Sequence, residues 1–275
     1  MPFKIYQNIK NSIFAKFPRI ILYPTLKLLN RIHLKKVFRS QSNESQIIDG
    51  LMKYNVKNLE VEFFEFGFDP TEFNCAIISS LGCKGTLIDT DAKKTNIGKK
   101  ILNKNTIIIN DKMLPDKLKA YKASNKFFIV SIDIDGNDYE YVANAFSELK
   151  PSILISEYNA IFQNKRMKVP FKENFNRHSH HGNYFGASLQ SLVDLAHSNS
   201  YCLAGVSHSA VNAFFVPSGH LSSHLCKSNL QFGLNQNKIG TVSKQGSRNL
   251  THMFAEISHL PLDNLDHLSR PCTAD

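Results

Sequence analysis

The sequence contains no charge-free run of about 18 apolar residues, the length that a membrane-spanning helix requires. Its first residues lack a continuous apolar core followed by a small-residue cleavage site, so we expect no secretory signal. The five cysteines are Cys75, Cys83, Cys202, Cys226 and Cys272. Their number is odd and none forms a CxxC pair, which argues against a disulfide framework and a zinc ribbon. We therefore expect a protein of the reducing cytoplasm.

Several catalytic signatures are also missing. The sequence has no GxSxG, P-loop, HExxH or kinase motif, and it lacks the glycine fingerprint of dinucleotide-binding proteins. With 275 residues, of which 42% are hydrophobic and 11% aromatic, the chain can bury the core of one domain of ordinary size plus an appendage.

Positive charge is concentrated at the N-terminus. Nine Lys and Arg residues precede the first acid, Glu44, so residues 41–275 carry only about +1 of the net charge of +10. Lys27, Arg31 and Lys35 recur at every fourth residue, and leucines fall on another side, which predicts a basic amphipathic helix within residues 1–43. Such a helix can bind an anionic membrane surface, which would make the chain a peripheral protein at the inner face of a membrane. Alternatively it can pack on the main domain as a solvated helix. We expect no nucleic-acid partner, because the remaining chain is nearly neutral.

A strand, a turn and a helix start are predicted between residues 59 and 81. The apolar strand ends at Phe66, Gly67 can adopt backbone angles closed to other residues and leave room for a ligand, and Asp69 can cap a helix from Pro70 to Leu81. A second strand, Gly85 to Asp89, ends in a carboxylate that could accept hydrogen bonds from a ribose diol. The alternative to a ribose-binding turn is a turn that has only a structural role in packing.

The remaining elements alternate in an α/β order over residues 44–220. Further strands are predicted at 106–110, 127–134, 152–157, 201–206 and 211–216, and helices at 46–54, 114–123, 139–149 and 188–196. The last two strands have the spacing of a hairpin. We therefore predict a mostly parallel seven-stranded sheet that ends in an antiparallel hairpin, with helices on both faces. The long loop 158–186 is expected to be functional or mobile, and residues 221–275 form a C-terminal extension in which only 250–262 suggests packed structure.

Five short motifs carry a family resemblance. They are EFG at 65–67 with TEFN at 71–74, SIDIDGND at 131–138, ISEYN at 155–159, GASL at 186–189 and VNAFFV at 211–216. Together they resemble the FkbM-type branch of the class I S-adenosylmethionine-dependent methyltransferases, over roughly residues 45 to 220. The fold of that class is Rossmann-like.

The resemblance implies S-adenosylmethionine as cofactor. It would lie across Glu65, Gly67 and Asp69 with Asn74 nearby, with its ribose at Asp89 and its adenine near Asn110 or Asp111. The implied reaction is O-methylation of a sugar, glycan or other small hydroxylated metabolite. The first loop of the family has two or three glycines, whereas here only Gly67 is present. A non-catalytic binding protein that retains the fold, and less strongly an NAD-dependent oxidoreductase, remain alternatives.

The reaction centre is predicted at the end of the fourth strand. Asp133 and Asp135 alternate along it and should share a face, and Glu157 ends the next strand. One carboxylate could accept the proton of the methyl acceptor, or the three could bind a divalent cation, although no metal is expected to be needed. His181, in a histidine-rich part of the long loop, is a further candidate base. Asn159 could orient the acceptor or form structural hydrogen bonds.

Overall fold

The computed structural model of the chain describes residues 40, 42–55, 60–121, 127–221, 225–226, 229–235 and 250–268. The basic helix predicted within residues 1–43 therefore falls almost entirely outside the described residues. None of the helices formed by the described residues combines the length and apolar character that a membrane crossing needs.

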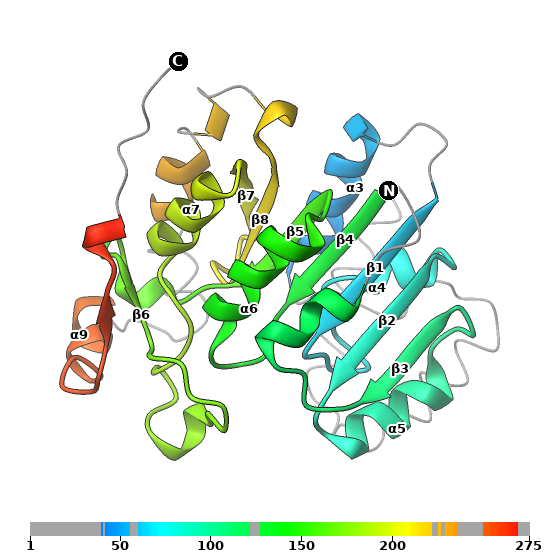
Figure 1. Cartoon of the computed structure of the whole chain (residues 1–275), viewed down its shortest axis with the longest axis horizontal. Helices are drawn as coiled ribbons and strands as arrows, with labels where there is room; N and C mark the ends of the chain where they lie inside the picture. Colours follow the sequence, from blue (N-terminus) through cyan, green and yellow to red (C-terminus); the bar gives the residue numbers. More distant parts are fainter. Residues whose placement is uncertain are drawn as a thin grey trace, which may run out of the picture.

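Seven strands form one sheet in the order β3-β2-β1-β4-β5-β8-β7 (Figure 1). Their bounds are Val61–Phe66 (β1), Lys84–Asp89 (β2), Thr106–Asn110 (β3), Phe127–Ile132 (β4), Ile153–Glu157 (β5), Tyr201–Val206 (β7) and Asn212–Pro217 (β8). Strands β1 to β5 are parallel, β8 is antiparallel to β5, and β7 is antiparallel to β8. The predicted Rossmann-like sheet with its closing antiparallel hairpin is confirmed.

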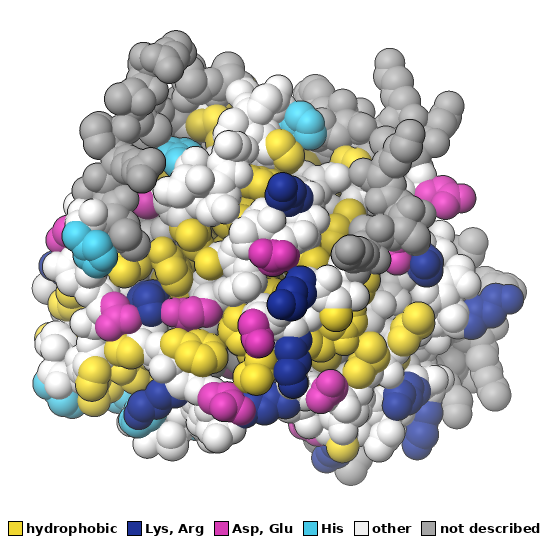
Figure 2. Space-filling model, viewed as in Figure 1, with side chains coloured by type: hydrophobic (Ala, Val, Ile, Leu, Met, Phe, Trp, Pro, Cys, Tyr) yellow, Lys and Arg dark blue, Asp and Glu magenta, His cyan; other side chains and the backbone are white. Residues whose placement is uncertain are grey.

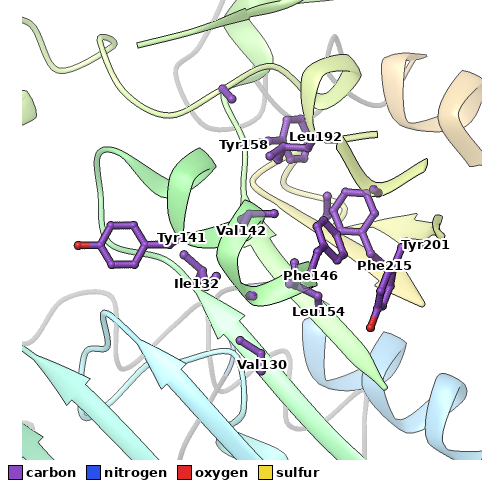
Figure 3. Packing of buried hydrophobic residues seen from close by; sticks show 14 of the residues in the cluster. Val130, Ile132, Tyr141, Val142, Phe146, Leu154, Tyr158, Leu192, Tyr201 and Phe215 are labelled. Carbon is purple, nitrogen blue, oxygen red and sulfur yellow. The ribbon is translucent and has the colours of Figure 1, made fainter. Parts of the chain in front are cut away.

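Helices cover both faces of this sheet. On one face lie α6 (Asp138–Asn144), which continues as a π-helical turn (Ala145–Leu149), and α7 (Leu189–Ser198). On the other lie α3 (Glu44–Asn55), α4 (Ala76–Ser80) and α5 (Ala92–Ile101). Each face buries its own cluster of apolar side chains, and Figure 3 shows how Val142 of α6 and Phe146 of the π-helical turn pack over the strands of the first face. The strands are apolar on both faces because both faces are covered.

Two predicted helices differ from the structure, and one helix was not predicted. The helix expected from Pro70 to Leu81 is α4, which begins only at Ala76, because residues 69–72 form a tight turn. The helix expected at 114–123 is a 3-10 helix, Pro115–Ala120. Helix α5 was not predicted, because its lysine-rich sequence has few apolar positions, yet Asp91 caps it by accepting hydrogen bonds from the backbone N–H groups of Lys93 and Lys94.

The long loop and the C-terminal extension pack on one another. The loop contains two 3-10 helices (Ala160–Phe162 and Arg177–Ser179) and strand β6 (Met167–Lys168). From the extension come α9 (Leu250–Ala255), β9 (Asp263–Asn264) and a 3-10 helix (Asp266–Leu268). Strand β9 pairs with β6, and α9 buries Met253 with residues of the loop, so the two lie side by side in Figure 1. The loop is thus braced by residues about 70 to 100 positions further along the chain.

Cys202 and Cys226 form a disulfide, contrary to the expectation from cysteine spacing. Strand β7 carries Cys202, and the short segment after β8 brings Cys226 to within 5.7 Å of it, measured between Cα atoms. Spacing could not reveal this pair because the hairpin and not a local motif brings it together. Cys75 and Cys83 are free thiols.

Candidate functional site

A cleft of about 1130 Å³ lies at the carboxyl ends of β1 to β5, toward which the strand arrows in Figure 1 point. The loops after β1, β2 and β4 form its floor, and residues 171–178 of the long loop form a wall. Ligands of open α/β sheets bind at this edge. The cleft is lined by ten Asp and Glu side chains and by only four Lys and Arg side chains. On the face shown in Figure 2, by contrast, acidic and basic side chains are interspersed.

Glu65 holds the first loop from below. Its carboxylate accepts hydrogen bonds from the backbone N–H groups of Asn74, at 2.7 Å, and Cys75, at 2.8 Å. The side chain is 1% exposed, and burial raises the pKa of Glu65 to about 7 although both hydrogen bonds favour the charged form. Glu65 therefore fixes the shape of the turn.

A glycine is required at position 67 because the loops after β1 and β4 approach each other closely there. Its φ is +75°, and a Cβ atom there would lie 1.7 Å from the carbonyl oxygen of Asp133. The expectation that the missing side chain makes room for a ligand is wrong, because the β4 loop fills that space. Gly67 instead lets the β1 and β4 loops meet in the floor of the cleft.

Asp69 and Asn74 serve local structure. Asp69 does not cap α4: its Oδ1 accepts hydrogen bonds from the backbone N–H and the hydroxyl of Thr71, at 2.9 and 2.5 Å. Asn74 is buried, donates to Ser131 Oγ at 3.1 Å, and accepts from Asn212 at the same distance. Asp69 lines the cleft, whereas Asn74 does not.

Asp89 and Asp111 both line the cleft. Asp89 Oδ2 accepts a hydrogen bond from Phe68 N at 3.1 Å, and Oδ1 accepts one from Asp91 N at 2.7 Å. The Asp89 carboxylate therefore links the β1 and β2 loops, and Lys94 Nζ lies 3.7 Å from its Oδ2. A carboxylate oxygen can accept two hydrogen bonds, so Oδ1 in particular can accept one from a ligand. Asp111 is exposed at the end of β3, and Asn110 next to it donates to the Asp89 carbonyl oxygen at 3.0 Å.

The three predicted reaction-centre carboxylates come together. One oxygen each of Asp133, Asp135 and Glu157 lies within 4.8 Å of the other two. The cause differs from the predicted strand alternation, because β4 ends at Ile132 and Asp135 has a left-handed φ of 57°. Asp138 stabilises this loop by accepting from the N–H groups of Ile134, at 2.9 Å, and Gly136, at 3.2 Å, so its role is structural.

Arg177 is the residue that sequence reasoning missed. From the long loop its Nη1 lies 2.5 Å from Asp135 Oδ1 and 3.9 Å from Glu157 Oε1, and its guanidinium stacks over the Phe185 ring at 4.5 Å. Nothing in the sequence marks one arginine of a 29-residue loop as the partner of this cluster. Glu157 is 7% exposed, and burial together with the charges of Asp133, Asp138 and Asp135 raises its pKa well above the usual range, against the opposing effect of Arg177.

His181 and Asn159 are directed away from the cleft. His181 Nδ1 accepts from Asn183 N at 3.2 Å, and its Nε2 lies 3.7 Å from a Glu256 carboxylate oxygen, so the ring faces the C-terminal extension. Of the loop histidines among the described residues, His178 lines the cleft. Asn159 is buried and donates to the carbonyl oxygens of Asn183 and Phe185. Of its two predicted roles, these contacts correspond to structural hydrogen bonding and not to orienting the acceptor.

No protein-family model and no curated protein matches the sequence. Several solved structures are similar in chain arrangement. The O-methyltransferase from Bacillus cereus in complex with SAH is 12% identical, with a TM-score of 0.44 over 77% of this chain and 95% of that one. A TehB-like SAM-dependent methyltransferase from Corynebacterium glutamicum is 11% identical, with a TM-score of 0.39 over 65% and 89%. An O-methyltransferase family protein from Burkholderia thailandensis is 8% identical, with a TM-score of 0.41 over 64% and 55%. Similarity at this level carries no argument about activity.

Proposed function

We propose that this chain is an S-adenosylmethionine-dependent methyltransferase that methylates a hydroxyl group of a sugar, glycan or other small hydroxylated metabolite. One observation carries the proposal: a single cleft at the carboxyl edge of the sheet joins the Asp89 turn to the cluster of Asp133, Asp135 and Glu157. A nucleoside-binding turn and a proton acceptor are the two parts that such a reaction needs side by side.

The residues present suit the cofactor. Asp89 has acceptor capacity left for a ribose hydroxyl, and Asp111 lies at the next strand end, where an adenine would follow. The cleft volume of about 1130 Å³ is slightly above the usual range for small-molecule sites, which leaves room for an acceptor as well. The acidic lining favours a ligand with a positive sulfonium centre.

When bound, S-adenosylmethionine supplies a methyl group already activated by the positive sulfur. The protein must orient the acceptor and take its proton. Glu157 suits this step because its Oε2 is buried without a hydrogen-bond partner among the described residues, and its raised pKa increases its affinity for a proton. Glu157 would take the proton of the acceptor hydroxyl, and the residues around Asp89 would hold the cofactor that supplies the methyl group.

The first test is isothermal titration with S-adenosylmethionine, S-adenosylhomocysteine and NAD⁺. Binding of the first two and not of NAD⁺ supports the proposal, whereas binding of NAD⁺ alone would favour an oxidoreductase. A radiolabelled methyl-transfer assay with sugar acceptors, with and without a chelator, then tests catalysis. Activity that survives the chelator fits a proton shared among the carboxylates, and activity restored by Mg²⁺ fits a metal at the same residues.

A non-catalytic binding protein is the second candidate. It is favoured by the first loop, where Asp69 is engaged by Thr71 and a compact turn stands in place of a glycine-rich loop. Absence of binding by both sulfur compounds, in a folded protein, would support it.

The FkbM-type assignment and a location at the inner face of a membrane belong to the same proposal. They are supported by the motifs at 65–74, 131–138 and 211–216 and by the basic pattern of residues 1–40. A lipid-linked or surface-polysaccharide precursor would be an acceptor that suits both features.

A further inference from the structure

The charge of the cleft is opposite to that of the chain. Its ten acidic and four basic lining side chains give a formal charge of −6 with histidine neutral, in a protein of net charge +10. An acidic cleft attracts cations and repels phosphates and carboxylates. The charge of the cleft therefore favours an acceptor with a positive charge.

The carboxylate cluster has unused hydrogen-bonding capacity. Glu157 is 7% exposed, it faces the cleft, and its Oε2 has no partner among the described residues. A buried carboxyl oxygen without a hydrogen-bond partner is unfavourable, so such an atom points to a ligand that bonds to it. Asp133 and Asp135 lie beside it, so a donor placed there reaches three carboxylates at once.

The spacing of these oxygens fits an ammonium group. An ammonium nitrogen that donates three hydrogen bonds of about 2.8 Å along tetrahedral directions holds its acceptors about 4.6 Å apart. The three oxygens lie within 4.8 Å of one another, a separation that matches this requirement. A Mg²⁺ ion, with oxygens at about 2.1 Å, spans at most about 4.2 Å between opposite ligands.

Arg177 already neutralises part of the carboxylate cluster. Its guanidinium is already 2.5 Å from Asp135 and 3.9 Å from Glu157. Three ionised carboxylates and one guanidinium leave a formal charge of −2 at the cluster, so it still attracts a cation. The cluster thus has room for a further cation beside Arg177.

We infer that the methyl acceptor carries a protonated amino group, as in an amino sugar or amino alcohol, which Asp133, Asp135 and Glu157 bind. This inference rests on the proposed function, since it concerns the acceptor of that reaction. It predicts that anionic acceptors such as sugar phosphates are excluded.

The test compares matched probes by isothermal titration and ligand-observed NMR on the full chain, with and without saturating S-adenosylhomocysteine. Glucosamine should bind at least about tenfold more tightly than glucose or N-acetylglucosamine, because a charged hydrogen bond replaces a neutral one, and glucose 6-phosphate should bind least. Ethanolamine against ethylene glycol repeats the comparison on a smaller scale. Equal binding of the charged and neutral probes, binding of neither amine, or preference for the phosphate would overturn the inference.

Two variants with opposite expected signs sharpen the test. Asp135→Asn, at a side chain that is 61% exposed, should reduce the preference for glucosamine over glucose to about threefold or less, whereas Arg177→Gln removes the competing cation and should increase it. Glu173→Gln, an exposed acid of the same cleft outside the cluster, should leave the preference unchanged. A decrease in both Asp135→Asn and Arg177→Gln would indicate a structural effect and contradict the inference.

The failures can be told apart. If S-adenosylhomocysteine binds but the amines show no preference, the inference fails and the proposed function stands. If the amines bind with the expected preference but S-adenosylhomocysteine does not, the proposed function fails. Amine binding that disappears when S-adenosylhomocysteine is added would assign the cluster to the cofactor's own amino group and overturn the inference. Tight Mg²⁺ binding that Asp135→Asn abolishes, without amine preference, would also overturn it.

Discussion

Asp89 offers the most direct test of cofactor binding. Replacing Asp89 by Ala removes the proposed ribose acceptor and also two loop hydrogen bonds, from Phe68 N and Asp91 N. A hydrogen bond to a charged group contributes roughly 1 to 3 kcal/mol, so the dissociation constant of S-adenosylhomocysteine should rise about 5-fold to about 150-fold. Asp89→Asn keeps one acceptor oxygen and loses the charge, so its effect should be smaller.

The loop hydrogen bonds require a control. Asp91→Ala in the same turn removes the cap of α5, which accepts from Lys93 N at 2.7 Å and Lys94 N at 3.3 Å, but leaves the Asp89 side chain in place. This variant should lose about 1 kcal/mol of unfolding free energy and change the affinity less than about threefold. Affinity is measured by isothermal titration and stability by urea unfolding of each variant. Unchanged affinity in a folded Asp89→Ala protein would refute the assigned role.

The remaining predictions concern the base, a buried acid and the N-terminus. Glu157→Gln should lower the methyl-transfer rate about 100-fold or more with little change in cofactor affinity, and a rate within threefold of the parent would exclude Glu157 as the base. Because the pKa of Glu65 is about 7 in the folded chain against 4.5 unfolded, its contribution to stability is present at low pH and lost as pH rises from about 4.5 to 7. The free energy of unfolding, measured with urea, should therefore be lower at pH 8 than at pH 5 by an amount that is about 2 to 3 kcal/mol smaller in Glu65→Gln than in the parent. Reversing the charges of Lys27, Arg31 and Lys35 should abolish salt-sensitive sedimentation of the full chain with anionic vesicles, and reversal at residues 99–100 should not; equal sedimentation of both variants would exclude the stripe as an anchor.

The sheet was predictable because its strands are continuous apolar runs. Ile153–Glu157 and the hairpin of β7 and β8 follow from local pattern alone, and the structure confirms them. The pattern failed at α5, where two pairs of lysines conceal a helix that depends on its cap and on the buried Thr95, Gly98 and Ile101. Local pattern also placed the start of α4 six residues too early, because Asp69 and Pro70 are as suitable for a turn as for a cap.

The candidate site was predictable only in part. Acidic residues at strand ends must meet at one edge of a parallel sheet, so the proximity of Asp133, Asp135 and Glu157 follows from topology. The partner of the cluster does not, because Arg177 arrives from a long loop whose path depends on packing against the C-terminal extension. The same packing turns His181 toward Glu256, which no local pattern could indicate.

The polar network beneath the first loop has a consequence for synthesis. Asn212 Nδ2 donates to Asn74 at 3.1 Å and to Glu44 at 3.4 Å, and these last two lie 138 and 168 residues earlier in the chain. Glu44 is buried, and so is Asn74, whose backbone N–H is bound by Glu65. On a ribosome the early strands can pair as they emerge, but this network cannot close until β8 has left the exit tunnel. The first loop of the cleft therefore matures late, although its sequence is among the first to be made, and a nascent chain stopped before Asn212 should lack a finished cofactor turn.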